Sequence, residues 1–441
     1  MSAASSGRRA ERRRSPRRVA LEVIRRVTED GAYSNLALRV ALSRAGLSGR
    51  DAALATELAY GTLRHLPALD RVLAGLLDRP LAEAPPPALA ALRLGAYQLL
   101  HTRIPPHAAV AETVGLVRQR GLVNAVLRRL AAAPPGEPSG EDDEAISLRS
   151  GLAPWAVGEL RALLPPEEVE LAARALGEPA RVGLRVNTCR ASLEQVQARL
   201  AEAGVRAERS PLHPDCLLLE RGAPAELPGF AEGWFTVQDP ASALVVSALE
   251  PRPGERVLDA CAGPGGKAGH IACVLGPGGL LVAADASEHR AHLIRRTAER
   301  LGVTARVLVQ DGRRPALRGG FDRALVDAPC SGLGSARRRP ELLWRVDPAE
   351  LVGLAELQRG ILLATAQLLA PGGRLVYSVC TFPRTETDEV CDALLDGRSD
   401  LEPEPVPGPD GPAERLRLWP HRHGCDAMFV AGFRKHEPVG R

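Results

Sequence analysis

Lysine, aromatic residues and long apolar runs are scarce in this 441-residue sequence. Lys267 and Lys435 are the only lysines among 57 basic residues. Because arginine has replaced lysine almost everywhere else, the lysine retained in the glycine-rich loop at 267 is a candidate functional residue. Aromatic residues make up 3% of the chain, which argues against a platform of stacked rings for nucleobases. No apolar run approaches the roughly 20 residues needed to cross a bilayer, and the N-terminus lacks the apolar stretch of a secretory signal. We therefore expect a cytosolic protein that does not associate with membranes.

Cysteine patterns typical of metal sites or disulfide frameworks are also missing. The eight cysteines form no C-x-x-C pair and no short cluster with histidine, so we expect neither a zinc site nor a disulfide scaffold. We interpret Cys189, Cys216, Cys273, Cys391 and Cys425 as inert buried side chains. Neither G-x-G-x-x-G nor G-x-x-x-x-G-K-[ST] occurs at the glycine-rich loop, which disfavours hydride transfer and nucleotide hydrolysis.

The chain has ordinary globular composition, with 45% hydrophobic and 25% charged residues, and its length predicts two or three domains. Residues 1–15 are predicted to form a disordered basic arm, which is either a tether for nucleic acid or a solvated tail. Apolar residues at three- and four-residue spacing predict an all-helical domain over 16–132. A stretch rich in proline, glycine and acidic residues predicts a linker at 133–145. A small α+β subdomain is expected at 146–245.

In residues 246–437 the sequence pattern differs, because predicted strands, loops and helices alternate. Short apolar strands are predicted near residues 256, 280, 306, 323 and 374. This alternation is typical of a doubly wound, Rossmann-like parallel sheet, which binds its ligands at the carboxyl ends of the strands. The fold class is therefore α/β, with a helical N-terminal domain and a small α+β insert.

The glycine-rich loop after the first of these strands is predicted to bind a cofactor. Small residues let a ligand approach the backbone, and the N–H groups of the following helix face it. An acidic residue at the end of the second strand can bind ribose hydroxyls, and one at the end of the third can border a base. Such aspartates can also simply cap helices. The predicted ligand is S-adenosylmethionine, and its predicted contacts are Cys261, Ala262, Gly263, Pro264, Gly265, Gly266, Lys267, Asp285, Asp311 and Asp327.

Two cysteines follow the fourth and fifth predicted strands, at positions 330 and 380. They should therefore lie over the same crevice. Carbon 5 of cytosine is a poor nucleophile until a thiolate has added to carbon 6, and a second thiol can assist the later release. Asp327 is placed to bind the base edge and to stabilise its protonated ring nitrogen. Lys267 can favour the thiolate or orient Asp327.

Arginines just beyond Cys330 are candidate RNA contacts. Their guanidinium groups can bind phosphates, although exposed arginine runs are more often solvated surfaces. A target base must leave its stack to reach two buried thiols, which favours a loop or partly unfolded RNA as substrate. The predicted contacts are Arg337, Arg338, Arg339 and Arg345.

Four motifs of the chain resemble those of the Nop/Sun family of RNA cytosine methyltransferases. They lie at 237–242, 259–267, 327–332 and 378–381. The segments at 60–64 and 122–129 are similar to NusB-type helical RNA-binding domains, and the combination implies a 16S ribosomal RNA substrate. The resemblance implies that Cys380 is the nucleophile and that Cys330 releases the product, whereas DNA cytosine methyltransferases attack with the equivalent of Cys330. It also implies S-adenosylmethionine as cofactor. Apart from the resemblance, we expect no metal and a monomer. A transfer RNA methyltransferase and a non-catalytic RNA-binding protein are the alternatives.

Overall fold

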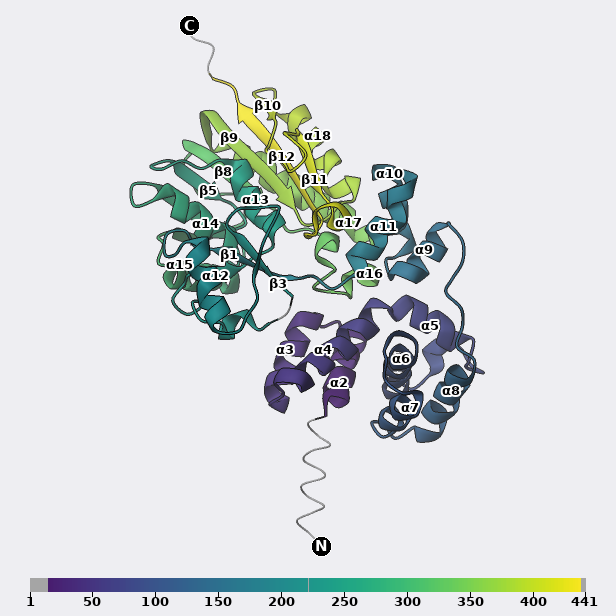
Figure 1. The fold of residues 1–441 in the computed structure, drawn as a ribbon. Helices are drawn as coiled ribbons and strands as arrows, with labels where there is room; N and C mark the ends of the chain where they lie inside the picture. Colours follow the sequence, from purple (N-terminus) through teal and green to yellow (C-terminus); the bar gives the residue numbers. More distant parts are fainter. Residues whose placement is uncertain (1–14, 221, 438–441) are drawn as a thin grey trace. The chain divides into compact units, whose positions relative to one another are not determined.

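The computed structural model describes residues 15–220 and 222–437, which divide into two compact units (Figure 1). The first unit contains the described residues up to Glu178 together with Ala336–Arg345, and the second contains the rest. The predicted basic arm lies outside the described residues except for Ser15. Within the described part of the chain, no helix combines the length and the apolar character that a membrane span requires.

The first unit is helical, and local sequence signals set where its helices begin and end. The Ser15 side chain accepts a hydrogen bond from the backbone N–H of Arg18, and Pro16 opens α2. Gly46, at a φ of 65°, ends α3 in the left-handed region that favours glycine. The helices are α2 (Pro16–Glu29), α3 (Ser34–Ala45), α4 (Gly49–Arg64), α5 (Leu66–Ala74), η1 (Leu81–Glu83), α6 (Pro86–His101), α7 (Pro106–Val114), α8 (Arg120–Ala132), α9 (Asp143–Ser150), α10 (Pro154–Leu163) and α11 (Pro166–Gly177).

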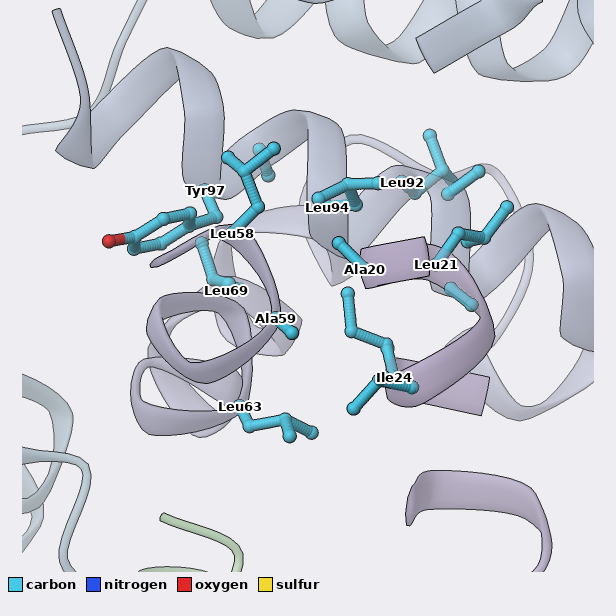
Figure 2. Packing of buried hydrophobic residues seen from close by; sticks show 14 of the residues in the cluster. Ala20, Leu21, Ile24, Leu58, Ala59, Leu63, Leu69, Leu92, Leu94 and Tyr97 are labelled. Carbon is cyan, nitrogen blue, oxygen red and sulfur yellow. The ribbon is translucent and has the colours of Figure 1, made fainter. Parts of the chain in front are cut away.

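Aliphatic side chains from α2, α4 and α6 form the core of this unit (Figure 2). Ile24, Leu58 and Leu94 are fully buried, and burial of each such side chain stabilises the fold by roughly 1.5–3 kcal/mol. A side chain at Gly61 would place its Cβ 2.0 Å from the ring of Tyr97. Glycine at 61 therefore allows α4 to pack closely against α6.

The division between the units differs from the predicted domain limits. Helix α9 begins at Asp143, so only residues 133–142 lack helix and strand, against a predicted linker of 133–145. Helices α9 to α11 group with the helical unit, although we expected residues 146–178 to belong to the α+β subdomain. These helices pack on one another, and α9 also packs on α5, which the helical periodicity alone could not show.

The second unit contains a small antiparallel sheet with strand order β2-β3-β1-β4. Strand β1 pairs with β3 on one side and with β4 on the other. Helix α12 begins with a capping box in which Ser192 and Gln195 satisfy each other's backbone N–H groups. The elements are β1 (Val182–Val186), α12 (Leu193–Glu202), β2 (Glu208–Arg209), β3 (Cys216–Leu219), η2 (Pro224–Glu226) and β4 (Phe235–Val237).

The large sheet of the second unit has the order β10-β12-β9-β8-β5-β6-β7, and β11 pairs with β12. Strands β5 to β9 are parallel, as predicted, whereas β10, β11 and β12 add an antiparallel edge. The elements are α13 (Pro240–Leu249), β5 (Arg256–Asp259), α14 (Gly266–Leu275), β6 (Leu280–Asp285), α15 (Glu288–Leu301), β7 (Arg306–Val309), β8 (Phe321–Asp327), η3 (Leu333–Ser335), α17 (Pro348–Gln367), β9 (Leu369–Val379), η4 (Arg384–Glu386), α18 (Asp388–Gly397), β10 (Leu401–Glu404), β11 (Arg415–Leu418), α19 (Pro420–His423) and β12 (Met428–Lys435). Helix α16 (Leu342–Arg345) belongs to the first unit.

Both faces of the large sheet are covered, so successive strand residues enter different cores. Val257 of β5 packs with α13 and α14, whereas its neighbour Leu258 packs with α17. The strands are therefore continuously apolar, as expected for a parallel sheet between helices. Asp327 is in register with Ser378, which brings the carboxyl ends of β8 and β9 to the same edge of the sheet.

Candidate active site

The glycine-rich loop joins β5 to α14 in a tight turn. Its backbone is held by a hydrogen bond from Ala262 N to Ala284 O and another from Gly265 N to Ala262 O. Gly265 has a φ of 105°, which requires glycine. A Cβ at Gly263 would lie 2.5 Å from an oxygen of Asp285, so the backbone is packed directly against that carboxylate. The predicted cofactor-binding residues 261–267 thus form one turn at the carboxyl edge of the sheet.

Asp285 and Asp311 occupy different environments, although both follow parallel strands. The buried Asp285 carboxylate accepts hydrogen bonds from the backbone N–H groups of Gly263, at 3.1 Å, and Ser287, at 2.9 Å. Asp311 is exposed, and the guanidinium of Arg313 lowers its pKa to about 2. Asp285 therefore contacts the glycine-rich loop directly, and Asp311 is ionised at the surface.

Asp259, at the end of β5, is fully buried beside this loop. Within the described residues, neither of its carboxylate oxygens meets the geometry of a full hydrogen bond, although the nearby backbone N–H of Cys261 favours its charged form. Burial, followed by the charge of Asp327, raises the pKa of Asp259 to about 7. Two buried acceptors without full hydrogen bonds are costly, so this carboxylate is suited to a ligand that brings a positive charge or N–H groups.

Lys267 and Asp327 form an ion pair, with 2.7 Å between Nζ and Oδ2. The other oxygen of Asp327 accepts a hydrogen bond from the Ser378 hydroxyl at 2.8 Å. Burial lowers the pKa of Lys267, but Asp327 and Cys380 outweigh burial, so the pKa of Lys267 is raised overall. The lysine is therefore a fixed positive charge beside Cys380. No sequence pattern indicated that Ser378 orients the carboxylate partner of this lysine.

The sulfurs of Cys330 and Cys380 lie 3.5 Å apart, beyond the ends of adjacent strands β8 and β9. The two thiols therefore lie side by side at the carboxyl edge of the sheet. A hydrogen bond with Cys380, burial, and the charges of Cys380, Glu386 and Asp327 raise the pKa of Cys330 well above its ordinary value. The surroundings therefore favour the protonated thiol at Cys330.

Sequence reasoning missed a buried polar network behind the two cysteines. Glu386 and Gln358 are fully buried and bonded to each other, and the Tyr377 hydroxyl donates to the side-chain oxygen of Gln358. The one available signal was a glutamate six positions after Cys380, and a single glutamate at that distance has no specific meaning. The network is visible only after α17 has packed against the sheet.

The arginines predicted to contact RNA lie in the segment 336–345, which belongs to the first unit. Arg345 donates hydrogen bonds to the carbonyl groups of Val27, Gly31 and Ala32, at 2.6, 3.0 and 3.1 Å. These carbonyls lie at or just beyond the C-terminal end of α2, where a positive charge is stabilising. Arg345 thus has a structural role that its sequence position did not indicate, and RNA contact by this group stays a prediction.

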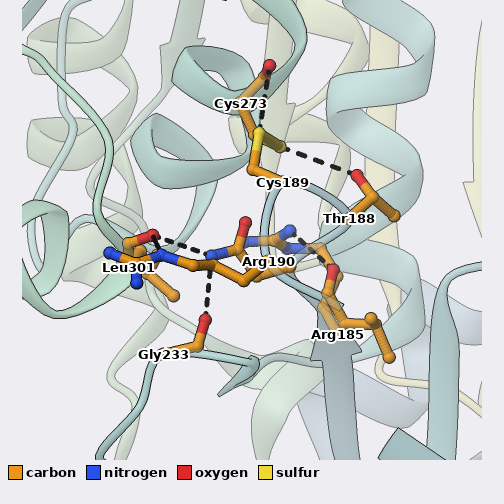
Figure 3. Close-up of a disulfide and its surroundings, with 9 residues drawn as sticks. Arg185, Thr188, Cys189, Arg190, Gly233, Cys273 and Leu301 are labelled. Atoms are coloured by element: carbon orange, nitrogen blue, oxygen red, sulfur yellow. Dashed lines mark hydrogen bonds between the residues drawn. A yellow bond between two sulfur atoms is a disulfide. The ribbon is translucent and has the colours of Figure 1, made fainter. Parts of the chain in front are cut away.

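A disulfide joins Cys189, in the loop after β1, to Cys273 of α14, with 5.8 Å between their Cα atoms (Figure 3). The interpretation of both residues as inert buried thiols was therefore wrong. Cys189 is exposed, and the Thr188 hydroxyl lies 3.6 Å from the sulfur of Cys273. The two cysteines are 84 residues apart in different parts of the fold, so their spacing could not reveal the pair.

One cluster of possible metal ligands occurs among the described residues, formed by His213, Asp215 and His270. Its candidate ligand atoms lie within 4.8 Å of one another. Burial lowers the pKa of both histidines, and the buried guanidinium of Arg185 lowers it further. The same positive charge disfavours a cation at this position.

The fold and the paired cysteines define a Rossmann-like methyltransferase, and comparisons identify its family. Models described as 16S rRNA methyltransferase RsmB/F, NusB family, and ferredoxin-like domain of RsmF/B-like methyltransferases match residues 246–434, 14–132 and 153–226. Ribosomal RNA small subunit methyltransferase B from Klebsiella pneumoniae is 37% identical, covering 90% of this chain and 94% of the relative. The chain belongs to the RsmB/F family of methyltransferases, which confirms the predicted resemblance and the NusB-like domain.

Solved structures share this architecture. The crystal structure of PH0851 aligns with 95% of this chain and 99% of its own, with a TM-score of 0.83 and 26% identity. A methyltransferase homolog protein from Pyrococcus horikoshii aligns with 66% of this chain and 97% of its own, with a TM-score of 0.57 and 29% identity.

Proposed function

We propose that this protein transfers a methyl group from S-adenosylmethionine to carbon 5 of a cytosine in 16S ribosomal RNA, with Cys380 as nucleophile. The observation that carries the proposal is the pair of thiols 3.5 Å apart beside the Lys267–Asp327 ion pair. Carbon 5 methylation of cytosine requires covalent activation at carbon 6, and a second thiol serves the release step. The name of the Klebsiella relative supports small-subunit ribosomal RNA as substrate.

The residues at the glycine-rich loop fit S-adenosylmethionine. The unpartnered oxygens of Asp259 suit its ammonium group, and the close approach of Asp285 to Gly263 leaves a carboxylate at the loop for ribose hydroxyls. When bound, this cofactor supplies an electrophilic methyl group on a sulfonium. The exposed Asp311 is proposed to border the adenine.

The protein's own residues divide the chemistry between the two thiols. The positive charge of Lys267 favours the thiolate of Cys380, which adds to carbon 6 of the base. Asp327 binds the base edge and stabilises the ring nitrogen as it gains a proton. Once Cys380 is bonded to carbon, its negative charge is gone, so Cys330 can more easily release its own proton to solvent, and the resulting thiolate then takes the proton from carbon 5. The carbon–sulfur bond then breaks and Cys380 leaves as a thiolate.

The test is to incubate wild type, Cys330→Ala and Cys380→Ala with unmodified 16S RNA and S-adenosylmethionine, and to look for covalent RNA–protein adducts on a denaturing gel. We expect an adduct with Cys330→Ala and none with Cys380→Ala. The reverse pattern would exchange the two roles. Methylation of transfer RNA in place of 16S RNA would identify the family alternative, and cofactor binding without methylation of either RNA would favour a non-catalytic binding protein.

A further inference from the structure

Glu386 lies behind both cysteines and is fully buried. Its Oε1 accepts hydrogen bonds from the backbone N–H of Ser331, at 2.8 Å, and from the Gln358 amide, at 3.0 Å. Its Oε2 accepts from the hydroxyls of Ser331, at 2.5 Å, and Thr381, at 3.4 Å. One carboxylate therefore binds four donors from three separate segments of the chain.

Two of these partners are the residues that directly follow the cysteines. Ser331 follows Cys330, Thr381 follows Cys380, and the two hydroxyls lie 2.7 Å apart. Gln358 also donates to the carbonyl of Pro329, at 3.0 Å, so the loop containing Cys330 is held on both sides. We propose that Glu386 is a positioning residue whose carboxylate ties the two cysteine loops together and keeps Cys330 a protonated thiol while Cys380 attacks. This inference rests on the proposed function.

The negative charge of Glu386 needs an explanation beyond packing. All four hydrogen bonds come from neutral N–H or O–H groups, and no salt bridge within the described residues includes it. A buried carboxylate without a cation is costly, whereas a neutral glutamine could fill the same space with similar hydrogen bonds. The charge is therefore retained for its effect on neighbouring groups.

Those neighbours show how the charge would act. The groups that raise the pKa of Cys330 are Cys380, Glu386 and Asp327, and Tyr377 is neutral because its own pKa is raised well above its ordinary value. Lys267 interacts instead with Asp327 and Cys380. Glu386 and Asp327 thus disfavour a negative charge on Cys330, whereas the ammonium group of Lys267 interacts favourably with a negative charge on Cys380, so the single negative charge of the pair favours the attacking sulfur.

The experiment separates the charge of Glu386 from its hydrogen bonds. Glu386→Gln removes the charge and can keep most hydrogen bonds, and Glu386→Ala removes both. The matched control is Glu389→Gln, three residues away, where the glutamate is half exposed and 3.9 Å from Arg359. In a Cys380→Ser background, Cys330 titrates alone, so its alkylation by iodoacetamide from pH 6 to 11 is followed by peptide mass spectrometry.

We expect Glu386→Gln to shift the alkylation midpoint of Cys330 down by about one pH unit and Glu389→Gln to leave it unchanged. With Cys380 present, Glu386→Gln should lower kcat for methyl transfer by about 10-fold and Glu386→Ala by about 100-fold, with little change in the KM for S-adenosylmethionine. Circular dichroism and thermal melts identify any variant that fails to fold, and Ser331→Ala, which removes one partner of Glu386, should then lower kcat in the same direction.

Unchanged Cys330 titration and unchanged kcat in a folded Glu386→Gln protein would overturn this inference while leaving the proposed function intact. A lower kcat in both glutamine variants would show a general effect of lost surface charge and would also overturn it. Absence of methyl transfer by wild type is a failure of the proposed function, and the Cys330 titration still reports on Glu386 in that case.

Discussion

The two close cysteine pairs of the second unit differ in their surroundings as much as in their bonding. Cys189 and Cys273 are joined near the surface, whereas Cys330 and Cys380 approach to 3.5 Å and remain two thiols beside the Lys267–Asp327 ion pair. Helix α14 takes part in both sites, since it contributes Lys267 at one end and Cys273 near the other. Proximity therefore determines the reactivity of a cysteine pair only together with the burial and the charges around it.

The largest difference between the pairs should appear in catalysis. Cys380→Ala removes the nucleophile, and we expect methyl transfer to 16S RNA to fall by at least about 10⁴-fold. Cys273→Ser removes the other pair, and we expect kcat within about 3-fold of wild type because no reacting atom is lost. Initial rates with labelled S-adenosylmethionine measure both. Equal losses in the two variants would erase the distinction between a reactive and a structural pair.

Removing the positive charge beside the thiol pair should have the next largest effect. Lys267→Met leaves Asp327 without its cation and takes away the charge that favours the Cys380 thiolate, so we expect kcat to fall by about 10²–10³-fold. The matched control is Lys435→Met, because the ammonium group of Lys435 donates to the carbonyl of Leu369, away from the thiols. Alkylation of Cys380 in Lys267→Met should also require a higher pH, and an unchanged pH dependence would contradict the assigned role.

The bonded pair should matter for stability. Cys189→Ser and Cys273→Ser each open the loop of 84 residues, and we expect either to lower the free energy of unfolding by about 2–4 kcal/mol. A reducing agent should lower the stability of wild type by a similar amount and leave the serine variants unchanged. Chemical denaturation with and without dithiothreitol measures this. If the reducing agent destabilised the serine variants as much as wild type, its effect would not come from the Cys189–Cys273 disulfide.

The smallest effect concerns Asp259 and depends on pH. Its folded pKa of about 7 lies above the unfolded value, so the folded state binds this proton more tightly and wild-type stability falls as pH rises from about 4 to 7. The stability of the Asp259→Asn variant does not fall in this way, because asparagine does not titrate. We expect the cofactor-free variant to be less stable than wild type near pH 4, because its buried amide lacks partners, and to gain stability relative to wild type by pH 8, because only wild type loses the tightly bound proton. Denaturation at both pH values tests the sign, and binding of S-adenosylmethionine should weaken.

The sequence predicted the parts of the site that follow from strand ends. A parallel sheet brings the carboxyl ends of its strands to one edge, so the strand pattern alone was enough to place Asp285, Asp327 and the two thiols together. Glu386, Ser378 and the Cys189–Cys273 disulfide could not be placed in this way, because each depends on how distant segments pack. The contacts of Arg345 could not be predicted for the same reason. Its position near a motif suggested phosphate binding, whereas in the folded chain its guanidinium donates hydrogen bonds to three backbone carbonyls.

The segment Ala336–Arg345 has a consequence for how the protein is made. It lies between β8 and α17 in the chain but packs within the helical unit, where Trp344 donates a hydrogen bond to the Leu63 carbonyl at 2.8 Å. During synthesis from the N-terminus, the helical unit therefore cannot complete its packing until four of the eight strands of the large sheet, β5 to β8, have been translated. A fragment that ends after α11 would leave the carbonyls of Val27, Gly31 and Ala32 without Arg345, so the helical unit depends on a segment from much later in the chain.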